Sequence, residues 1–306
     1  MTDSQKNYLI VTPVKNEGVN LPDLIRSIAS QTLKPVLWVI VDDGSTDNTP
    51  DIIREAKKNY DWIESIQMNS DKRDLGLHLA KVVRTGFDFA IEHCNKNGID
   101  YEYLANVDGD LTLDRTFFEN LIKEFERDPE LGVASGGIKL PVGDQMVHIE
   151  GLPEDEPSGG DMLIKRECFE KCGGIPVSYS WDSVLKAKAQ LRGWKTRRFE
   201  ENIATEIRGV SSAEGYWKGY MHKGTGAHYL NLHPFHVFVK TVIYLLHRRG
   251  KEPWYVGIAY LAGYLGSVMK RKEQVDDEEV RKYFWNKFWN KWKNINKLRL
   301  FKLRDQ

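Results

Sequence analysis

The sequence has little cysteine, and its few cysteines lack the spacings that would give them a structural role. They are Cys94, Cys168 and Cys172, with no C-x-x-C pair and no histidine partner at zinc-finger spacing. This pattern argues against a disulfide framework and against a structural zinc site. We expect buried free thiols, as in proteins of a reducing compartment.

The sequence also lacks an excess of either charge, and it lacks long apolar runs. Lysine plus arginine and aspartate plus glutamate both number 44, so no overall field attracts nucleic acid and we expect no nucleic-acid partner. Residues 1–6 are polar and contain no apolar core of a secretion signal. The uncharged stretch 254–269 has 16 residues, which is short for a bilayer span. The sequence predicts a cytoplasmic protein.

What the sequence does contain is an alternation of short apolar runs with amphipathic helical segments. Strands are predicted at 8–12, 36–41, 62–68, 101–107 and 132–140. Helices are predicted at 20–31, from about 49, and at 75–93, 117–127 and 181–192. Such alternation implies right-handed crossovers, and therefore an α/β fold with a doubly wound, mostly parallel sheet flanked by helices.

Polar motifs follow three of these strands. They occupy residues 12–17, 42–45 and 108–110, and ligands of such sheets bind beyond the carboxyl ends of the strands. Asp108-Gly109-Asp110 places two carboxylates on one turn, where they repel each other unless a cation lies between them. Aspartate and glycine are also typical of ordinary turns, so the motif alone leaves both interpretations open.

Four ordered motifs together resemble glycosyltransferase family 2. They are V-T-P-V-K-N-E-G at 11–18, V-D-D-G-S-T-D-N-T at 41–49, D-G-D at 108–110 and W-D at 181–182. The resemblance covers about residues 8–233 and implies the GT-A fold with an inverting mechanism. It suggests a GT-A catalytic domain at 1–233, with a nucleotide-sugar half at about 1–110 and an acceptor half at about 111–233.

The resemblance also implies which residues bind the nucleoside diphosphate sugar donor. These are Thr12, Pro13, Glu17, Asp42, Asp43, Arg84 and Asp108. Asp42 is the weaker of the two acidic candidates, because it is equally suited to capping the following helix. His78, on the same predicted helix as Arg84, is interpreted as structural.

For the reaction itself, the resemblance implies a Mg²⁺ or Mn²⁺ ion and a general base. Asp108 and Asp110 would hold the metal, with Glu206 as a weak third ligand, because many relatives have histidine where this chain has Glu206. Asp182 matches the catalytic base, which takes a proton from the acceptor hydroxyl. The alternatives are a surface ion pair of Glu206 with Arg208, and a helix-capping role for Asp182.

Residues 234–306 form a predicted helical extension that is partly amphipathic, aromatic and basic. On a helical wheel, Phe284, Trp285, Phe288, Trp289, Trp292 and Ile295 lie within one arc opposite lysines. This pattern suits a helix on an anionic membrane, here the inner face of the cell membrane, and equally a helix docked on the catalytic domain. Membrane contact would favour a polyprenyl-phosphate-linked acceptor.

The sequence thus favours a metal-dependent, inverting glycosyltransferase. It would move a sugar from a nucleoside diphosphate to a glycan or lipid-linked acceptor, with Asp182 as general base. Two other hypotheses remain. A sugar nucleotidyltransferase usually carries a glycine-rich loop with arginine after the first strand, and residues 12–17 are not of this type. A catalytically inactive, membrane-associated scaffold would not need to retain the three aspartates.

Overall fold

A computed structural model describes residues 6–69, 76–142, 145–150, 152–207, 215–246, 253–287 and 289. The chain forms two compact units, which comprise residues 1–210 and 211–306. The division falls earlier in the chain than the boundary at 233 expected from the sequence. Helix α7 (Tyr216–Tyr229) therefore belongs to the second unit.

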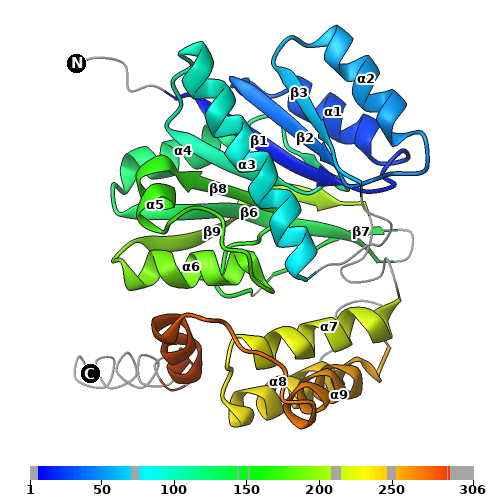
Figure 1. Ribbon diagram of the computed structural model, residues 1–306, viewed down its shortest axis with the longest axis vertical. Coiled ribbons are helices and arrows are strands. Elements are labelled where there is room, and N and C mark those ends of the chain that lie inside the picture. The colour runs from blue at the N-terminus through cyan, green and yellow to red at the C-terminus, as the bar shows by residue number, and fades with distance from the viewer. Residues whose placement is uncertain are drawn as a thin grey trace. The chain divides into compact units, whose positions relative to one another are not determined.

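The first half of the sheet consists of four parallel strands in the order β3-β2-β1-β4. Their bounds are β1 Tyr8–Val14, β2 Leu37–Asp42, β3 Ile63–Gln67 and β4 Tyr103–Val107. The apolar runs of β1, β2 and β4 are almost wholly buried, as expected for parallel strands covered on both faces. The predicted α/β fold with a doubly wound sheet is confirmed (Figure 1).

The second half of the sheet contains antiparallel neighbours, a detail that the sequence did not indicate. The strands are β5 Leu111–Leu113, β6 Leu131–Val142, β7 Gln145–His148, β8 Asp161–Lys165 and β9 Lys195–Glu206. β8 lies antiparallel between β4 and β6, β6 pairs in parallel with β9, and β9 pairs antiparallel with β5. The segment between β6 and β8 includes β7, which pairs antiparallel with β6.

Helices cover both faces of the sheet (Figure 1). One face packs on α1 Leu21–Ala29, α2 Thr49–Asn59 and α4 Phe117–Arg127. The other packs on α3 Leu77–Asn97, α5 Arg166–Lys171 and α6 Trp181–Leu191. In α1 the predicted core positions Leu21, Leu24 and Ile28 are fully buried, because their spacing places them on one side of the helix. The three cysteines are free and buried, as predicted.

The second unit contains α7, α8 (Pro234–Leu246) and α9 (Val256–Met269). The three helices share a cluster of tyrosine rings. Tyr244 of α8 meets Tyr220 of α7 edge-on at 5.1 Å between ring centroids, and Tyr260 of α9 at 5.3 Å. These contacts define the inner side of each helix.

Part of the predicted aromatic stripe of the tail is visible in this unit. Phe284 is buried, whereas Trp285 and Trp289 are exposed at their outer sides. The Trp285 ring lies 4.5 Å from that of His233, and the Trp289 ring stacks on Phe235 at 6.0 Å. Residues Phe288, Trp292 and Ile295 lie outside the described part of the chain. The described tail thus packs on the start of α8.

Candidate active site

The structure brings the three polar motifs together at one edge of the sheet. β1 pairs in parallel with both β2 and β4, so the carboxyl ends of these strands meet. The Asp43 N–H donates to the Val14 carbonyl at 2.9 Å. Gly109 packs against the first motif so closely that a Cβ there would lie 2.9 Å from Val14 Cγ1 and 3.2 Å from Glu17 Cγ.

Asp43 is held by two basic side chains. Its Oδ1 lies 2.7 Å from His78 Nε2, and its Oδ2 lies 3.7 Å from Lys15 Nζ. Lys15 also donates to the Asp43 carbonyl at 2.7 Å. The sequence predicted Asp43 as a donor-binding residue but assigned no part to Lys15 and only a structural one to His78. These contacts fix the direction of the carboxylate.

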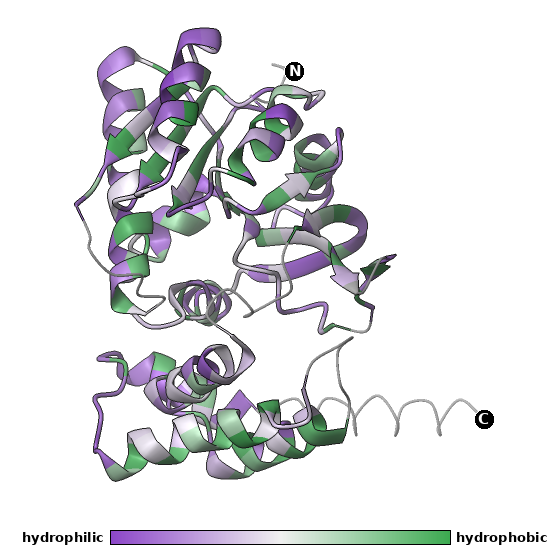
Figure 2. Cartoon of the chain, turned by 90° about the vertical axis from the view of Figure 1, so that its right-hand side faces the viewer, coloured by the Kyte–Doolittle hydropathy of each residue, from purple (hydrophilic) through white to green (hydrophobic). Residues whose placement is uncertain are grey.

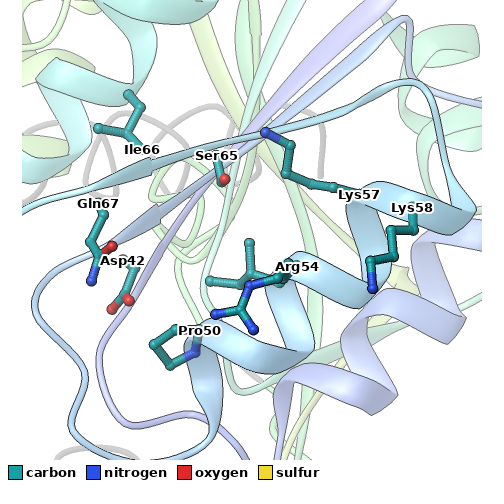
Figure 3. Close-up of a pocket in the computed structure, with 9 residues that line it drawn as sticks. Asp42, Pro50, Arg54, Lys57, Lys58, Ser65, Ile66 and Gln67 are labelled. Atoms are coloured by element: carbon teal, nitrogen blue, oxygen red, sulfur yellow. The ribbon is translucent and has the colours of Figure 1, made fainter.

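Asp42 points to the other face of the sheet. Its Oδ1 accepts a hydrogen bond from the Ser45 N–H at 2.9 Å, whereas its buried Oδ2 has no hydrogen-bond partner among the described residues. Asp42 lines a pocket of about 410 Å³ between α2, β2 and β3. Figure 3 shows Asp42 beside Gln67, with Arg54 nearby and the lysines of α2 farther along the pocket. The pocket therefore combines an unsatisfied carboxylate oxygen with cationic side chains.

Three residues of the first motif have different surroundings. Thr12 is fully buried, and its hydroxyl accepts a hydrogen bond from the Trp38 indole N–H at 2.9 Å. Glu17 is also buried and accepts from the Asn20 amide at 2.6 Å. Pro13 is partly exposed at the end of β1. Thr12 and Glu17 thus hold the motif in place through hydrogen bonds.

The contacts of Arg84 run along its own helix. Its guanidinium lies 3.5 Å from the Asp88 carboxylate one turn later, and its side chain is half exposed. Arg208, the suggested ion-pair partner of Glu206, lies outside the described residues.

Asp108 lies among other carboxylates. Its Oδ1 accepts a hydrogen bond from the Asn106 amide at 3.3 Å. Although the residue is exposed to solvent on one side, the surrounding protein desolvates its carboxyl, and this raises the pKa of Asp108 to about 7. The negative charge of Asp110, followed by those of Asp161 and Asp182, adds to the increase in this pKa.

Strand pairing brings Glu206 near the same turn. Glu206 is the last residue of β9 and lies opposite Leu111 of β5, the residue after Asp110. The next backbone N–H, of Ile207, donates to the Asp110 carbonyl at 3.0 Å. The three acidic residues predicted as metal ligands therefore belong to adjoining backbone segments.

Gly159 and Gly160 lie between the metal-binding candidates and the base candidate. A Cβ on Gly160 would lie 2.7 Å from Asp108 Oδ2, and a Cβ on Gly159 would lie 2.8 Å from Asp182 Cβ. Two hydrogen bonds of 2.8 Å fix the two glycines. The Asn106 side-chain amide donates to the Gly159 carbonyl, and the Asp108 N–H donates to the Gly160 carbonyl. Asp108 and Asp182, far apart in sequence, thus contact neighbouring residues.

The carboxylate of Asp182 is oriented by a lysine. Its Oδ2 lies 2.9 Å from Lys186 Nζ, one turn later on α6, and Lys186 also donates to the Pro157 carbonyl at 2.7 Å. Both side chains are largely buried. The capping position before α6 belongs to Ser180, whose side chain makes no capping bond. Lys186, rather than the helix N-terminus, is the partner observed for Asp182.

The segment that leads to this glycine pair is anchored through its backbone carbonyls. Thr196 donates to the Asp155 carbonyl at 2.7 Å, and Arg198 donates to the Glu156 carbonyl at 2.8 Å. After the glycines, the buried Asp161 accepts from the Gly136 N–H at 2.8 Å. Burial raises the pKa of Asp161 to about 6.

The sequence interpretation missed several residues of this arrangement. Asn106 and Asp161 would have been noticeable only from their positions, two residues before Asp108 and directly after the glycine pair. Lys186 follows Asp182 at the i,i+4 spacing of a helix pair, which is common on any helix surface. Nothing in the sequence distinguished these residues from ordinary polar ones.

The donor set partly meets the needs of a divalent cation. No group of three or more His, Cys, Asp or Glu residues in the described part of the chain has the geometry of a complete metal site. Asp108 and Asp110 do supply two hard carboxylates on one turn. Burial is the largest cause of the raised pKa of Asp108, and the charge of Asp110, which a cation would offset, is the second. Mg²⁺ and Mn²⁺ commonly take their remaining ligands from substrate phosphates and water, so the pair fits such an ion.

Comparison with known proteins relates this geometry to a family. Residues 9–144, which include the first three motifs, match the model of glycosyl transferase family 2. This part of the chain is thus similar to glycosyl transferase family 2. The description of the family and the names of the relatives below support an enzyme of the transferase class.

Curated proteins are similar over much of the chain. A poly-beta-1,6-N-acetyl-D-glucosamine synthase of Staphylococcus epidermidis is 25% identical over 276 residues, which are 81% of this chain and 62% of the relative. The synthase of Staphylococcus aureus strain COL is 23% identical over 250 residues, which are 74% of this chain and 56% of the relative. The chain thus spans about three fifths of the length of these relatives.

Solved structures share the fold. A mannosyltransferase of Pyrobaculum calidifontis, in complex with GDP-Man and Mn²⁺, has a TM-score of 0.54 at 17% identity, covering 86% of this chain and 75% of the other. The structure of residues 1–349 of S. aureus TarS, in complex with UDP-GlcNAc, has a TM-score of 0.52 at 15% identity. It covers 90% of this chain and 78% of the other. None of the helices described for this chain is both long and apolar enough to cross a bilayer.

Proposed function

We propose that this chain transfers a sugar, with inversion, from a nucleoside diphosphate sugar to an acceptor hydroxyl. The contact of Gly160 with Asp108 and of Gly159 with Asp182 carries the proposal. With the two glycines in this position, the diphosphate would lie against the turn of Asp108 and Asp110 while the acceptor hydroxyl approaches Asp182. The nucleotide sugars bound to the similar mannosyltransferase and TarS structures support a donor of this class.

The donor would extend along the edge of the sheet. Asp43, oriented by Lys15 and His78, would accept hydrogen bonds from the nucleoside. The diphosphate would lie near Asp108 and Asp110, which would hold Mg²⁺ or Mn²⁺. When bound, this ion would neutralise charge that develops on the departing diphosphate. Because the similar synthases are named for N-acetylglucosamine, UDP-N-acetylglucosamine is the first donor to test.

Asp182 would act as general base. Its carboxylate takes the proton from the acceptor hydroxyl as that oxygen forms a bond to the anomeric carbon. The bond from this carbon to the diphosphate breaks on the opposite side, so the configuration inverts and the nucleoside diphosphate leaves. Lys186 contributes by holding Asp182 Oδ2 in one direction. The acceptor would be a glycan or a polyprenyl-phosphate-linked sugar.

Two substitutions test the assignment of roles. Asp182→Asn keeps the size of the side chain but removes the base, so transfer should fall by about a hundredfold or more while donor affinity remains. Asp110→Asn should instead weaken the calorimetric affinity for the donor in the presence of Mn²⁺. The matched control is Asp61→Asn, at an exposed carboxylate outside the site.

The outcomes separate this function from its competitors. Near-normal transfer by Asp182→Asn would remove the base assignment, and unchanged affinity of Asp110→Asn would remove the metal assignment. Release of pyrophosphate from a nucleoside triphosphate and a sugar phosphate would instead indicate a nucleotidyltransferase. A protein that neither transfers nor slowly hydrolyses any donor of a panel with Mn²⁺ would be a scaffold.

A further inference from the structure

Helix α8 exposes an apolar face. Phe238, Ile243 and Leu246 are 58%, 47% and 72% exposed, and their spacing places them on the side away from Tyr244. Phe235, on which the Trp289 ring stacks, is not counted with them. The opposite side is buried at Val237 and Thr241. On a helix that meets only water, the outer side is normally polar.

Helix α9 repeats this pattern. Val256–Met269 contains no charged residue, and its exposed residues include Ile258, Leu265 and Met269 at 43%, 47% and 83% exposure. Trp254, just before the helix, is 57% exposed. Tyr260 and Gly263 lie on the buried side.

The two helices that carry these exposed sides pack against each other. α8 and α9 are in close contact, because a Cβ on Gly257 would lie 2.8 Å from the Thr241 carbonyl oxygen. Tyr244 and Tyr260 meet on the inner sides of the helices, so both outer sides point away from this cluster. Figure 2 shows α8 and α9 largely in hydrophobic colours. We call the exposed apolar residues of the two helices, with Trp254, the apolar face.

The stretch that contains both helices is mainly basic. Between Gly215 and Lys272 the sequence contains a single acidic residue, Glu252, whereas Glu273 and several acidic residues follow directly after Lys272. The exposed cations of the stretch include the run Lys270–Lys272, which directly follows the end of α9. Apolar and aromatic side chains bordered by cations are typical of helices that lie in the interface of an anionic membrane.

The dimensions of the helices agree with a position at the membrane surface. α8 has 13 residues and α9 has 14, which at about 1.5 Å per residue gives a length of about 20 Å. The hydrocarbon core of a bilayer is about 30 Å thick, so neither helix reaches across it. A helix of this kind lies parallel to the surface, with its apolar side chains among the lipid tails.

We propose that the apolar face of α8 and α9 binds the surface of a membrane that contains anionic lipid. The surface differs from the aromatic stripe of the tail, whose described tryptophans pack against His233 and Phe235. The lysines would lie at the phosphate groups, and the apolar side chains would enter the region below them. The binding requires no sugar donor and is independent of the transfer reaction.

The test measures co-sedimentation of the full chain with vesicles of phosphatidylcholine alone and of phosphatidylcholine mixed with phosphatidylglycerol. The wild-type chain should bind the mixed vesicles more strongly, and added salt should weaken this binding. Phe238→Gln combined with Leu265→Gln should reduce it by about a hundredfold, since each change removes a large apolar side chain from lipid. Both residues are exposed, so the melting temperature should remain close to that of the wild type.

Two further variants sharpen the result. Met146→Gln replaces an equally exposed apolar residue on β7 of the first unit and should leave vesicle binding within about twofold of the wild type. Lys270→Gln with Lys272→Gln should lower binding to anionic vesicles by about tenfold or more, with little effect on neutral ones.

Three outcomes would overturn the proposal. They are absence of wild-type binding to either vesicle, equal binding by the Phe238/Leu265 double variant, and formation of a dimer that this variant abolishes in analytical ultracentrifugation. The last would assign the apolar face to a second copy of the chain.

Discussion

Substituting alanine for Gly160 should disturb the carboxylate turn and little else. The added Cβ would lie 2.7 Å from Asp108 Oδ2 and 3.1 Å from its Cγ, so the carboxylate must move by several tenths of an ångström. Only the end of a side chain has to rotate, and the φ of Gly160 is not positive, so the stability cost should be at most about 1 kcal/mol. A misplacement of this size should weaken metal-dependent donor binding by roughly tenfold to a hundredfold.

Gly159→Ala, one residue earlier, provides the matched comparison. Its Cβ would lie 2.8 Å from Asp182 Cβ and 3.0 Å from both Cγ and Oδ2. Because a Cβ cannot rotate away, the start of α6 must shift, which should lower the free energy of unfolding by about 1–3 kcal/mol. The displaced carboxylate should reduce transfer by roughly a hundredfold. Donor affinity should be nearly unchanged.

Calorimetry with Mn²⁺ and donor, together with a transfer assay at saturating donor, separates the two variants. The two variants should show different defects: Gly160→Ala should lose donor affinity, and Gly159→Ala should lose turnover. Thermal melting controls for unfolding. Equal losses of affinity in both variants, or normal kinetics in both, would refute the inference that this glycine pair lies between metal-binding and proton-accepting carboxylates.

Three further predictions concern residues around the site. The pKa of Asp161 is about 6 in the folded protein, against an ordinary aspartate value of 3.8, so between these values the folded protein binds a proton that the unfolded protein does not. The free energy of unfolding should therefore fall by roughly 1–3 kcal/mol as pH rises from about 4 to 6. Asp161→Asn should make stability from chemical denaturation less dependent on pH in this range, and an unchanged dependence would contradict the assignment. Thr12→Val should lower the free energy of unfolding by about 1–3 kcal/mol, because the buried Trp38 N–H loses its acceptor, and an equal stability by urea unfolding would contradict this role. Lys186→Met should decrease kcat by about tenfold or more with little change in donor KM, because Asp182 loses its orienting partner, and a selective rise in KM would show that Lys186 binds donor instead.

The sequence predicted the parts of the fold that depend on local periodicity. The predicted helix at 117–127 coincides with α4, because Phe117, Leu121 and Phe125 repeat at helical spacing on a buried side. The antiparallel position of β8 between β4 and β6 could not be predicted, because the apolar pattern of a short buried strand does not show whether it pairs in parallel or antiparallel. Strand partners depend on the whole chain rather than on the strand itself.

The site was predictable to a similar degree. The motifs located Asp43 and Asp108 because strand ends of a parallel sheet meet at one edge. The approach of Gly159 and Gly160 to two distant aspartates was invisible in the sequence, since it depends on the path of the segment before β8. The sequence left open whether α8 and α9 support the tail or face a membrane, because the period of an apolar helix does not say what covers it.

The anchoring of the segment before the glycine pair has a consequence for which of its residues can be changed. Thr196, Arg198 and Lys186 donate hydrogen bonds to the backbone carbonyl groups of residues 155–157. Every amino acid has such a carbonyl group. The identities of these residues can therefore vary while the path of the main chain stays the same. A library randomised at Asp155 and Glu156, with Thr196, Arg198 and Lys186 left intact, should therefore retain folded members.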